Sequence, residues 1–134
     1  MKEIHKVAAW VIKDNKFLMV RKHGKDIWTS LGGRVESGET EEQALSREIM
    51  EEVGCTATIG KKVGDFFTQA IFDDAKLKLS VYLVALEGTP SVQDDELDDC
   101  AFISLDYKRH NIKLTDVIEE KIIPYCLQNG LLKK

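Results

Sequence analysis

The apolar and polar positions of the chain predict several β-strands around one long amphipathic helix. His5 to Ile12 is rich in β-forming residues and is followed by a polar turn at residues 13–16. Phe17 to Arg21 resumes the apolar pattern, so we expect the two segments to pair as an antiparallel hairpin. Three further strands are predicted by the same criteria, Thr56 to Ile71, Lys76 to Leu86 and the short Cys100 to Leu105.

Between these strands the spacing of apolar residues changes to that of a helix. Leucine, isoleucine and valine recur every four positions and form one stripe, Leu45, Ile49 and Val53. Thr40 and Gln43 match the capping-box pattern, and Gly54 suits a left-handed C-terminal cap. The sequence therefore predicts a helix with both ends defined.

A second helical segment is predicted near the end of the chain. Thr115 is expected to cap it, and Pro124 is expected to kink or split it because proline removes a helix hydrogen bond. Its apolar side consists of Val117, Ile118, Ile122, Ile123 and Leu127. We expect this segment to pack against the sheet on the face opposite the first helix.

Three glutamates lie beside the apolar stripe of the first helix. Glu48, Glu51 and Glu52 are spaced i, i+3 and i+4, so their carboxylates share one face. Two of them also occupy the last helical turn, where the helix dipole disfavours acids by about 0.3–1 kcal/mol each. One unfavourable cluster in an otherwise regular helix is typical of a functional site. The alternative is a solvated acidic face, with Arg47 paired to Glu51 at i+4.

The stretch from Gly33 to Cys55, GRVESGETEEQALSREIMEEVGC, resembles the Nudix box. That motif is G-x5-E-x7-R-E-U-x-E-E-x-G-U, in which U is a bulky apolar residue. Each fixed position is filled as the motif requires, with Cys55 in the final apolar position. One departure precedes the box, because family members often have proline before the glycine pair and this chain has Leu31. Substrate inferences that depend on that proline are weakened.

The resemblance implies an α/β protein with the Nudix fold, an α/β/α sandwich with a mixed β-sheet, formed by a single domain over residues 1–134. It also implies a metal site whose ligands are the Gly32 carbonyl, Glu48, Glu51 and Glu52. Hard carboxylate oxygens suit Mg²⁺ as the cofactor, with Mn²⁺ as a substitute. Glu39 lies at the helix entry instead of on the acidic arc, and is expected to orient Arg47 and the adjacent loop.

The implied activity is hydrolysis of a nucleoside diphosphate linked to another moiety, by attack of water on phosphorus. The expected substrate is a nucleoside triphosphate, oxidised forms included, which would give the monophosphate and pyrophosphate. ADP-ribose or a nucleotide sugar is the alternative. A protein of a different class, a Nudix-fold sensor that binds nucleotides without turnover, is disfavoured because every ligand glutamate is present.

The general base is left open among Glu51, Glu48 and Glu96. A carboxylate that binds metal has a lowered pKa and is a weaker base, so Glu96, a residue of an expected acidic loop at 94–99, stays a candidate beside the two helix glutamates. A solvated loop is the competing interpretation of this segment.

Substrate contacts are predicted around the glycine pair Gly32–Gly33, which we expect to form a loop. Arginine can bind two phosphate oxygens at once, so Arg21, with Lys25 or Arg34, is a candidate phosphate ligand. An ordinary strand end with solvated charges is the alternative. Trp28 is expected either to stack on a base or to pack beneath the loop.

Composition narrows the remaining possibilities. A chain of 134 residues with 31% charged residues fits one domain that buries a real core. Its formal charge of −4 argues against binding a nucleic-acid polymer. The three cysteines fit neither a zinc site nor a disulfide framework, and the apolar run Val7 to Ile12 is too short for a signal peptide or membrane span. We expect a cytoplasmic protein that acts on small nucleotides and does not contact membranes. Homodimers are common among similar proteins, although the sequence has no apolar stripe that requires a dimer interface.

Overall fold

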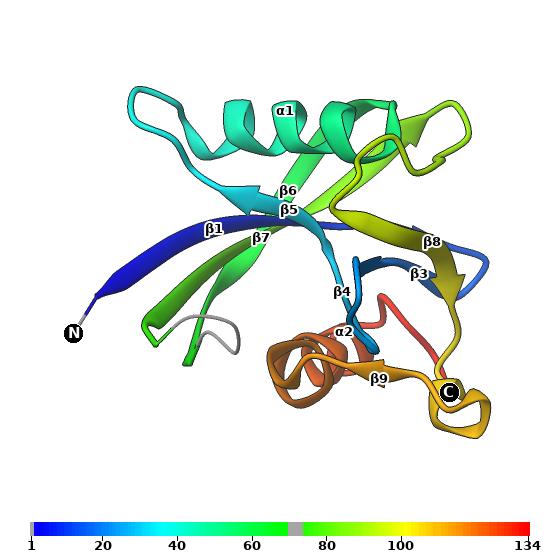
Figure 1. Cartoon of the computed structure of the whole chain (residues 1–134). Helices are drawn as coiled ribbons and strands as arrows, with labels where there is room; N and C mark the ends of the chain where they lie inside the picture. Colours follow the sequence, from blue (N-terminus) through cyan, green and yellow to red (C-terminus); the bar gives the residue numbers. More distant parts are fainter. Residues whose placement is uncertain (1, 70–73) are drawn as a thin grey trace.

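The computed structural model describes residues 2–69 and 74–134 (Figure 1). The strands are β1 (Glu3–Trp10), β2 (Ile12–Lys13), β3 (Lys16–Lys22), β4 (Ile27–Thr29), β5 (Leu31–Arg34), β6 (Thr56–Gln69), β7 (Lys76–Glu87), β8 (Leu97–Ile103) and β9 (Lys113–Leu114). The helices are α1 (Glu41–Val53) and α2 (Ile123–Gln128), with a 3₁₀ turn η1 (Tyr107–His110) and a π-helical turn η2 (Ile118–Ile122).

The strands form two sheets. The first has the order β5-β1-β7-β6, in which β1 and β7 are parallel and the outer pairs are antiparallel. The second has the order β2-β3-β4-β9, with β8 paired to β3. The expectation of one mixed sheet is therefore refined to two sheets, of which each contains both parallel and antiparallel pairs.

The expected hairpin between the first two apolar segments is only partly correct. Strand β1 ends at Trp10, and only β2 pairs with β3, through Ile12–Phe17 and Lys13–Lys16. The turn residues Asp14 and Asn15 have φ of 53° and 58°, as a tight two-residue hairpin turn requires. Because the chain changes sheet at Val11, β1 is free to pair with β5 and β7 instead.

Helical segments cover the two sides of the strands, as predicted. Helix α1 lies on one side, and η2 and α2 lie on the other (Figure 1). The predicted stripe of α1 is confirmed, since Leu45, Ile49 and Val53 are all buried. Full burial of such a side chain stabilises the fold by about 1.5–3 kcal/mol. A second cluster of buried residues, among them Trp10, Phe17 and Ile118, fills the space beneath the C-terminal segment.

The C-terminal segment is split, as Pro124 predicts, but its cap differs from the prediction. The backbone N–H of Ile123 donates to Ile118 O, which widens the turn before Pro124, the first-turn proline of α2. Thr115 does not cap with its hydroxyl. Its backbone carbonyl accepts the N–H groups of Ile118 and Glu119 at 3.1 Å each. The side-chain oxygen of Thr115 has no hydrogen-bond partner among the described residues.

Other predicted boundaries also shift. The glycine pair lies in strand β5 and not in a loop. Strand β8 begins at Leu97, so Asp98 and Asp99 belong to a strand and the acidic loop is shorter than expected. The predicted end of a strand at Ile71 lies outside the described residues. Within the described part of the chain, no helix has the length and apolar character needed to cross a membrane.

Candidate metal centre and nucleotide cleft

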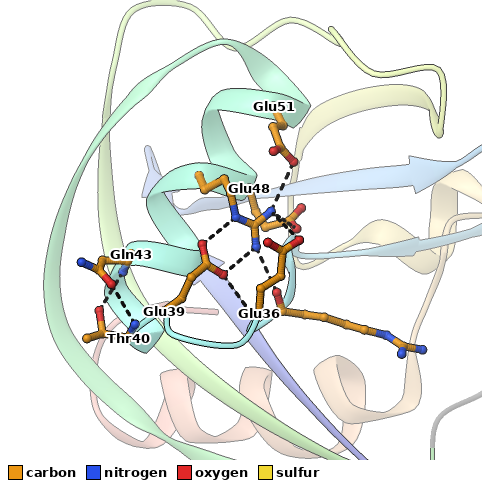
Figure 2. Close-up of polar contacts among 8 residues, drawn as sticks. Glu36, Glu39, Thr40, Gln43, Glu48 and Glu51 are labelled. Atoms are coloured by element: carbon orange, nitrogen blue, oxygen red, sulfur yellow. Dashed lines mark hydrogen bonds and ion pairs between the residues drawn. The ribbon is translucent and has the colours of Figure 1, made fainter.

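Helix α1 presents the acidic residues from a helix with well-defined ends. The Thr40 hydroxyl accepts the N–H of Gln43 at 3.1 Å, and the Gln43 side chain accepts the N–H of Thr40 at 2.9 Å (Figure 2). Gly54 closes the helix with φ of 69° and donates its N–H to Met50 O. This predicted capping box and C-terminal cap are confirmed. They fix the rotation of the helix and so the direction in which its glutamates point.

Glu52 is buried at the C-terminal end of α1. Its side chain accepts the backbone N–H of Gly32 at 2.9 Å, and the residue is only 8% exposed. Burial raises the pKa of Glu52 to about 8, against the lowering effect of the Gly32 hydrogen bond. A Cβ on Gly32 would lie 1.9 Å from Val7 O, so only glycine allows β5 to approach β1 this closely. The apoprotein therefore keeps Glu52 protonated at neutral pH.

Glu48 lies one helical turn before Glu52 and fills the space above Gly33. A Cβ on Gly33 would lie 2.4 Å from the carboxyl carbon of Glu48. Burial raises the pKa of Glu48, and its hydrogen bond from Arg47 opposes that shift. The absence of a side chain at Gly33 thus makes room for this carboxylate.

Arg47 connects the acidic residues of the site. Its guanidinium donates to both carboxylate oxygens of Glu39, at 2.7 and 2.9 Å, and to Glu48 at 2.9 Å (Figure 2). It also donates to Arg34 O at 3.1 Å and to Glu51 at 3.4 Å. The hydrogen bond from Arg47 holds the pKa of Glu39 at about 2. Arg47 thus pairs with Glu51, as the solvated-face alternative requires, but it also bridges to Glu39 and Glu48.

The three glutamates of the predicted metal site have different environments. Glu52 is buried, Glu48 is half-buried, and Glu51 is exposed with its carboxylate turned toward Arg47. In residues 2–69 and 74–134, no group of three histidine, cysteine or acidic side chains converges closely enough to hold an ion. The side chains present nevertheless fit a hard divalent cation. Two carboxylates are packed against the Gly32–Gly33 backbone, and because burial opposes their ionisation, a bound cation would stabilise their charged form. Arg47 contacts Glu48 through Oε1, so the second carboxylate oxygen of Glu48 could bind an ion while this contact is kept.

A cleft opens beside Glu52 and extends toward the C-terminal segment. Its cavity volume is about 100 Å³, and it is open to solvent at its mouth. Its lining includes Gly32, Gly33 and Glu52, together with Lys6 and Lys22. The C-terminal segment contributes Thr115, Asp116 and Val117 to the lining, and β7 contributes Leu77 and Leu79.

The predicted substrate contacts lie elsewhere, since none of Arg21, Lys25, Arg34 or Trp28 lines the cleft. Arg21 donates to Asp98 at 3.3 Å and to Lys25 O at 3.0 Å, with its guanidinium carbon 5.9 Å from the centre of the Trp28 ring. These contacts stabilise the connection between β3 and β4. Trp28 packs against the buried cluster beneath the C-terminal segment, and not beneath a glycine loop as one of the two sequence-based alternatives expected.

Within the acidic loop, Asp94 is a residue whose charge affects the pKa of Glu52. The charge of Asp94 contributes to the raised pKa of Glu52, and Gln93 N donates to Glu52 O at 2.9 Å. Glu96, the candidate base, is exposed and accepts the N–H of His23 through its backbone carbonyl at 2.8 Å. Glu96 is not a cleft-lining residue.

Sequence reasoning missed the cleft residues Lys6, Lys22, Thr115 and Asp116. Lys22 lies between Arg21 and Lys25, two of the predicted phosphate ligands, but nothing in the sequence distinguishes it from them. Thr115 was noticed only as a cap. No periodicity in the sequence indicates that β1, β3 and the C-terminal segment meet at one cleft.

Comparisons with known proteins identify the family and the fold. The sequence model described as "NUDIX domain" matches residues 3–125. A CTP pyrophosphohydrolase of Escherichia coli (strain K12) is 40% identical over 67 residues, which cover 47% of this chain and 50% of that protein. An 8-oxo-dGTP diphosphatase of Haemophilus influenzae is 45% identical over 62 residues, 42% of this chain and 46% of that protein. The matches thus span about half the length of these curated relatives.

A solved structure extends the similarity over the whole fold. A NUDIX hydrolase from Nitrosomonas europaea superposes with a TM-score of 0.79, covering 99% of this chain and 97% of that one. At 22% identity this likeness concerns the fold alone. It confirms the predicted α/β architecture.

Proposed function

The chain belongs to the Nudix family, and from this we propose that it is a pyrophosphohydrolase that converts a nucleoside triphosphate into the monophosphate and pyrophosphate. Members of this family use a divalent metal ion. We propose Mg²⁺ for this chain, with Mn²⁺ as a substitute, because its candidate ligands are all hard oxygens.

The observation that carries the proposal is the buried carboxylate of Glu52 in the lining of the cleft. A buried acid with a raised pKa and a single backbone hydrogen bond is expensive to ionise unless a cation is bound. Such a group in the lining of a cleft is a candidate functional residue on physical grounds. Glu52, Glu48 and the Gly32 carbonyl would hold the metal, with Glu51 as a further ligand if another residue is the base. The metal would supply screening of phosphate charge and activation of water.

Other residues of the site orient these ligands or attract the substrate. Glu39 fixes Arg47 through two hydrogen bonds, and Arg47 in turn orients Glu48. Lys6 and Lys22, which also line the cleft, are placed to attract the phosphate chain. Arg21, Lys25, Arg34 and Trp28 are therefore assigned no direct contact with substrate in this proposal.

Proton removal from the attacking water is assigned to Glu51, with Glu48 and Glu96 as the alternatives. Glu51 is the most exposed of the three helix glutamates, and its carboxylate accepts a long hydrogen bond from Arg47 at 3.4 Å. It can therefore accept a proton without first losing a strong partner. Glu96 would have to act from outside the cleft lining.

The substrate class is tested by a panel of nucleoside triphosphates, 8-oxo forms, ADP-ribose and nucleotide sugars, with Mg²⁺ and product identification. The proposal expects pyrophosphate release from triphosphates. Release of AMP and ribose 5-phosphate from ADP-ribose would move the assignment to the alternative substrate class. Tight binding of nucleotides with no turnover of any of them would indicate a sensor. A small nucleotide, not a nucleic-acid polymer, is the proposed ligand because the net charge is −4. A cytoplasmic location and a homodimer remain predictions.

A further inference from the structure

Asp98 joins strand β8 to the connection between β3 and β4. One carboxylate oxygen accepts the backbone N–H of Gly24 at 3.1 Å and a hydrogen bond from Arg21 at 3.3 Å. The other oxygen lies 2.7 Å from Nδ1 of His23. The hydrogen bonds from Gly24 and His23 hold the pKa of Asp98 below its ordinary value. Asp98 is therefore ionised at neutral pH, and both of its oxygens are engaged by this connection.

Asp98 occupies an irregular position in its strand. In the pairing of β8 with β3, Asp99 lies opposite Arg21, and the next pair is Leu97 with Lys22. Asp98 therefore has no counterpart on β3 and is the additional residue of a β-bulge. Bulges are common next to active sites, where they turn a side chain in a new direction. Here the carboxylate reaches past the end of β3 to the residues that follow it.

The residues at the end of β3 form a tight turn, residues 22–25. Its first carbonyl accepts its last N–H at 3.0 Å, and its third residue, Gly24, has φ of 72°, as a type II turn requires. The N–H of Gly24 donates to Asp98, and the N–H of His23 donates to Glu96 O at 2.8 Å. Both inner N–H groups of the turn are thus bound by β8 and the residue before it.

Lys22 is both the last residue of β3 and the first residue of this turn. It lines the cleft together with Val20 and Glu52. Burial raises the pKa of Glu52 to about 8, and the charge of Lys22 opposes this rise, so the ammonium group lies close enough to affect the acidic site. A lysine side chain has a long flexible stem, and the position of its charge depends on the backbone that carries it. The turn therefore helps to determine where this charge lies.

We propose that Asp98 is a positioning residue for substrate binding. By holding the turn 22–25 against β8, it keeps Lys22 at the cleft, where the lysine meets the phosphate chain. This inference rests on the proposed function for the role of Lys22. The direction of the effect is distinctive, because the negative charge of Asp98 by itself repels an anionic substrate. Loss of the charge alone would strengthen substrate binding, but loss of the positioning contacts weakens it.

The test compares Asp98→Ala with Asp98→Asn in steady-state kinetics with a nucleoside triphosphate. Alanine removes every side-chain contact with the turn, and asparagine retains an oxygen that can accept the N–H of Gly24. We expect Asp98→Ala to raise KM roughly 3- to 10-fold with kcat nearly unchanged, and Asp98→Asn to restore most of the affinity. The matched control is Asp99→Ala, which removes the same charge from the next residue, where the side chain accepts the N–H of Cys100. This control should leave KM unchanged or lower it.

A double-mutant cycle with Lys22→Met tests whether Asp98 acts through the lysine. Methionine keeps an unbranched side chain and removes the charge. If Asp98 positions Lys22, Asp98→Ala should have no further effect on KM in the Lys22→Met protein. Equal fold-changes in both backgrounds would overturn the proposal, because Asp98 would then act independently of Lys22. A KM for Asp98→Ala equal to or below that of wild type would overturn it as well.

Binding measured without turnover separates this inference from the proposed activity. Calorimetry with inorganic pyrophosphate and Mg²⁺, carried out on the proteins of this cycle, reports contacts with phosphate alone. A roughly 3- to 10-fold loss of affinity in Asp98→Ala that disappears in the Lys22→Met background supports the positioning role, even if no nucleotide is hydrolysed. Equal pyrophosphate affinities for wild type and Asp98→Ala would refute it.

Discussion

The carboxylate of Glu52 accepts a hydrogen bond from the backbone N–H of Gly32 at 2.9 Å. This contact joins the last turn of α1 to strand β5 across twenty positions of sequence. It places a buried acid next to the backbone carbonyls of a glycine pair, where a cation could replace the proton. The first consequences concern the stability of the protein without metal.

In metal-free protein, Glu52 should make stability fall as pH rises. The folded-state pKa is about 8 and the ordinary value is 4.5, so between these pH values the unfolded chain releases a proton that the folded protein retains. Unfolding is therefore favoured progressively from pH 4.5 to pH 8, and the effect is constant above that range. Melts in EDTA at several pH values should show that Glu52→Gln is flatter in pH and more stable than wild type at pH 8. Parallel curves for the two proteins would contradict the raised pKa.

Replacing Gly33 by alanine should damage the metal site without unfolding the protein. The new Cβ would displace the carboxyl end of Glu48, which is the far end of a flexible side chain. We expect metal affinity to fall about 10- to 100-fold while the melting temperature changes little. The matched control is Gly64→Ala, because the nearest atom to a Cβ there is 3.8 Å away. Unchanged metal titration of Gly33→Ala would show that Glu48 does not need this position.

Arg47→Lys should also weaken metal binding, although the charge is preserved. Lysine cannot reproduce the paired hydrogen bonds to Glu39 while also reaching Glu48 and Arg34 O. We expect about a 10- to 100-fold higher metal requirement in a calorimetric titration. Arg109→Lys serves as the control, since Arg109 is an exposed residue of η1 remote in sequence from α1. Wild-type affinity in Arg47→Lys would mean that charge alone is sufficient.

The local features of α1 could be predicted because they depend on neighbours in sequence. The capping box of Thr40 and Gln43, the left-handed Gly54 and the buried stripe through Ile49 are short-range patterns, and each is present. The position of Pro124 likewise predicted a split in the C-terminal segment. These signals involve residues no more than a few positions apart.

The features that were wrong or missed depend on contacts between distant segments. The hairpin prediction placed β1 beside β3, but β1 pairs with β5 and β7. No local sequence pattern indicates this pairing. Residues 21–25 include three side chains of equal charge, Arg21, Lys22 and Lys25. Only the pairing of β3 with β8 and β4 determines that Lys22 lines the cleft while Arg21 contacts Asp98.

The general base can be identified by comparing Glu51→Gln with Glu96→Gln. If Glu51 accepts the proton, its replacement should lower kcat by about 100-fold or more and remove the acidic limb of the pH–rate profile. Glu96→Gln should then leave kcat within a few-fold of wild type, because Glu96 is exposed and outside the cleft lining. The reverse pattern would assign the role to the loop residue.

The most direct test of the central claim is the release of pyrophosphate from a nucleoside triphosphate, measured for wild type and Glu52→Gln across a Mg²⁺ titration. Wild type should release pyrophosphate and nucleoside monophosphate only with metal, and Glu52→Gln should be slower by at least 100-fold at saturating Mg²⁺. Equal rates for the two proteins, or wild-type hydrolysis that persists in EDTA, would contradict the assignment of Glu52 to a catalytic metal centre.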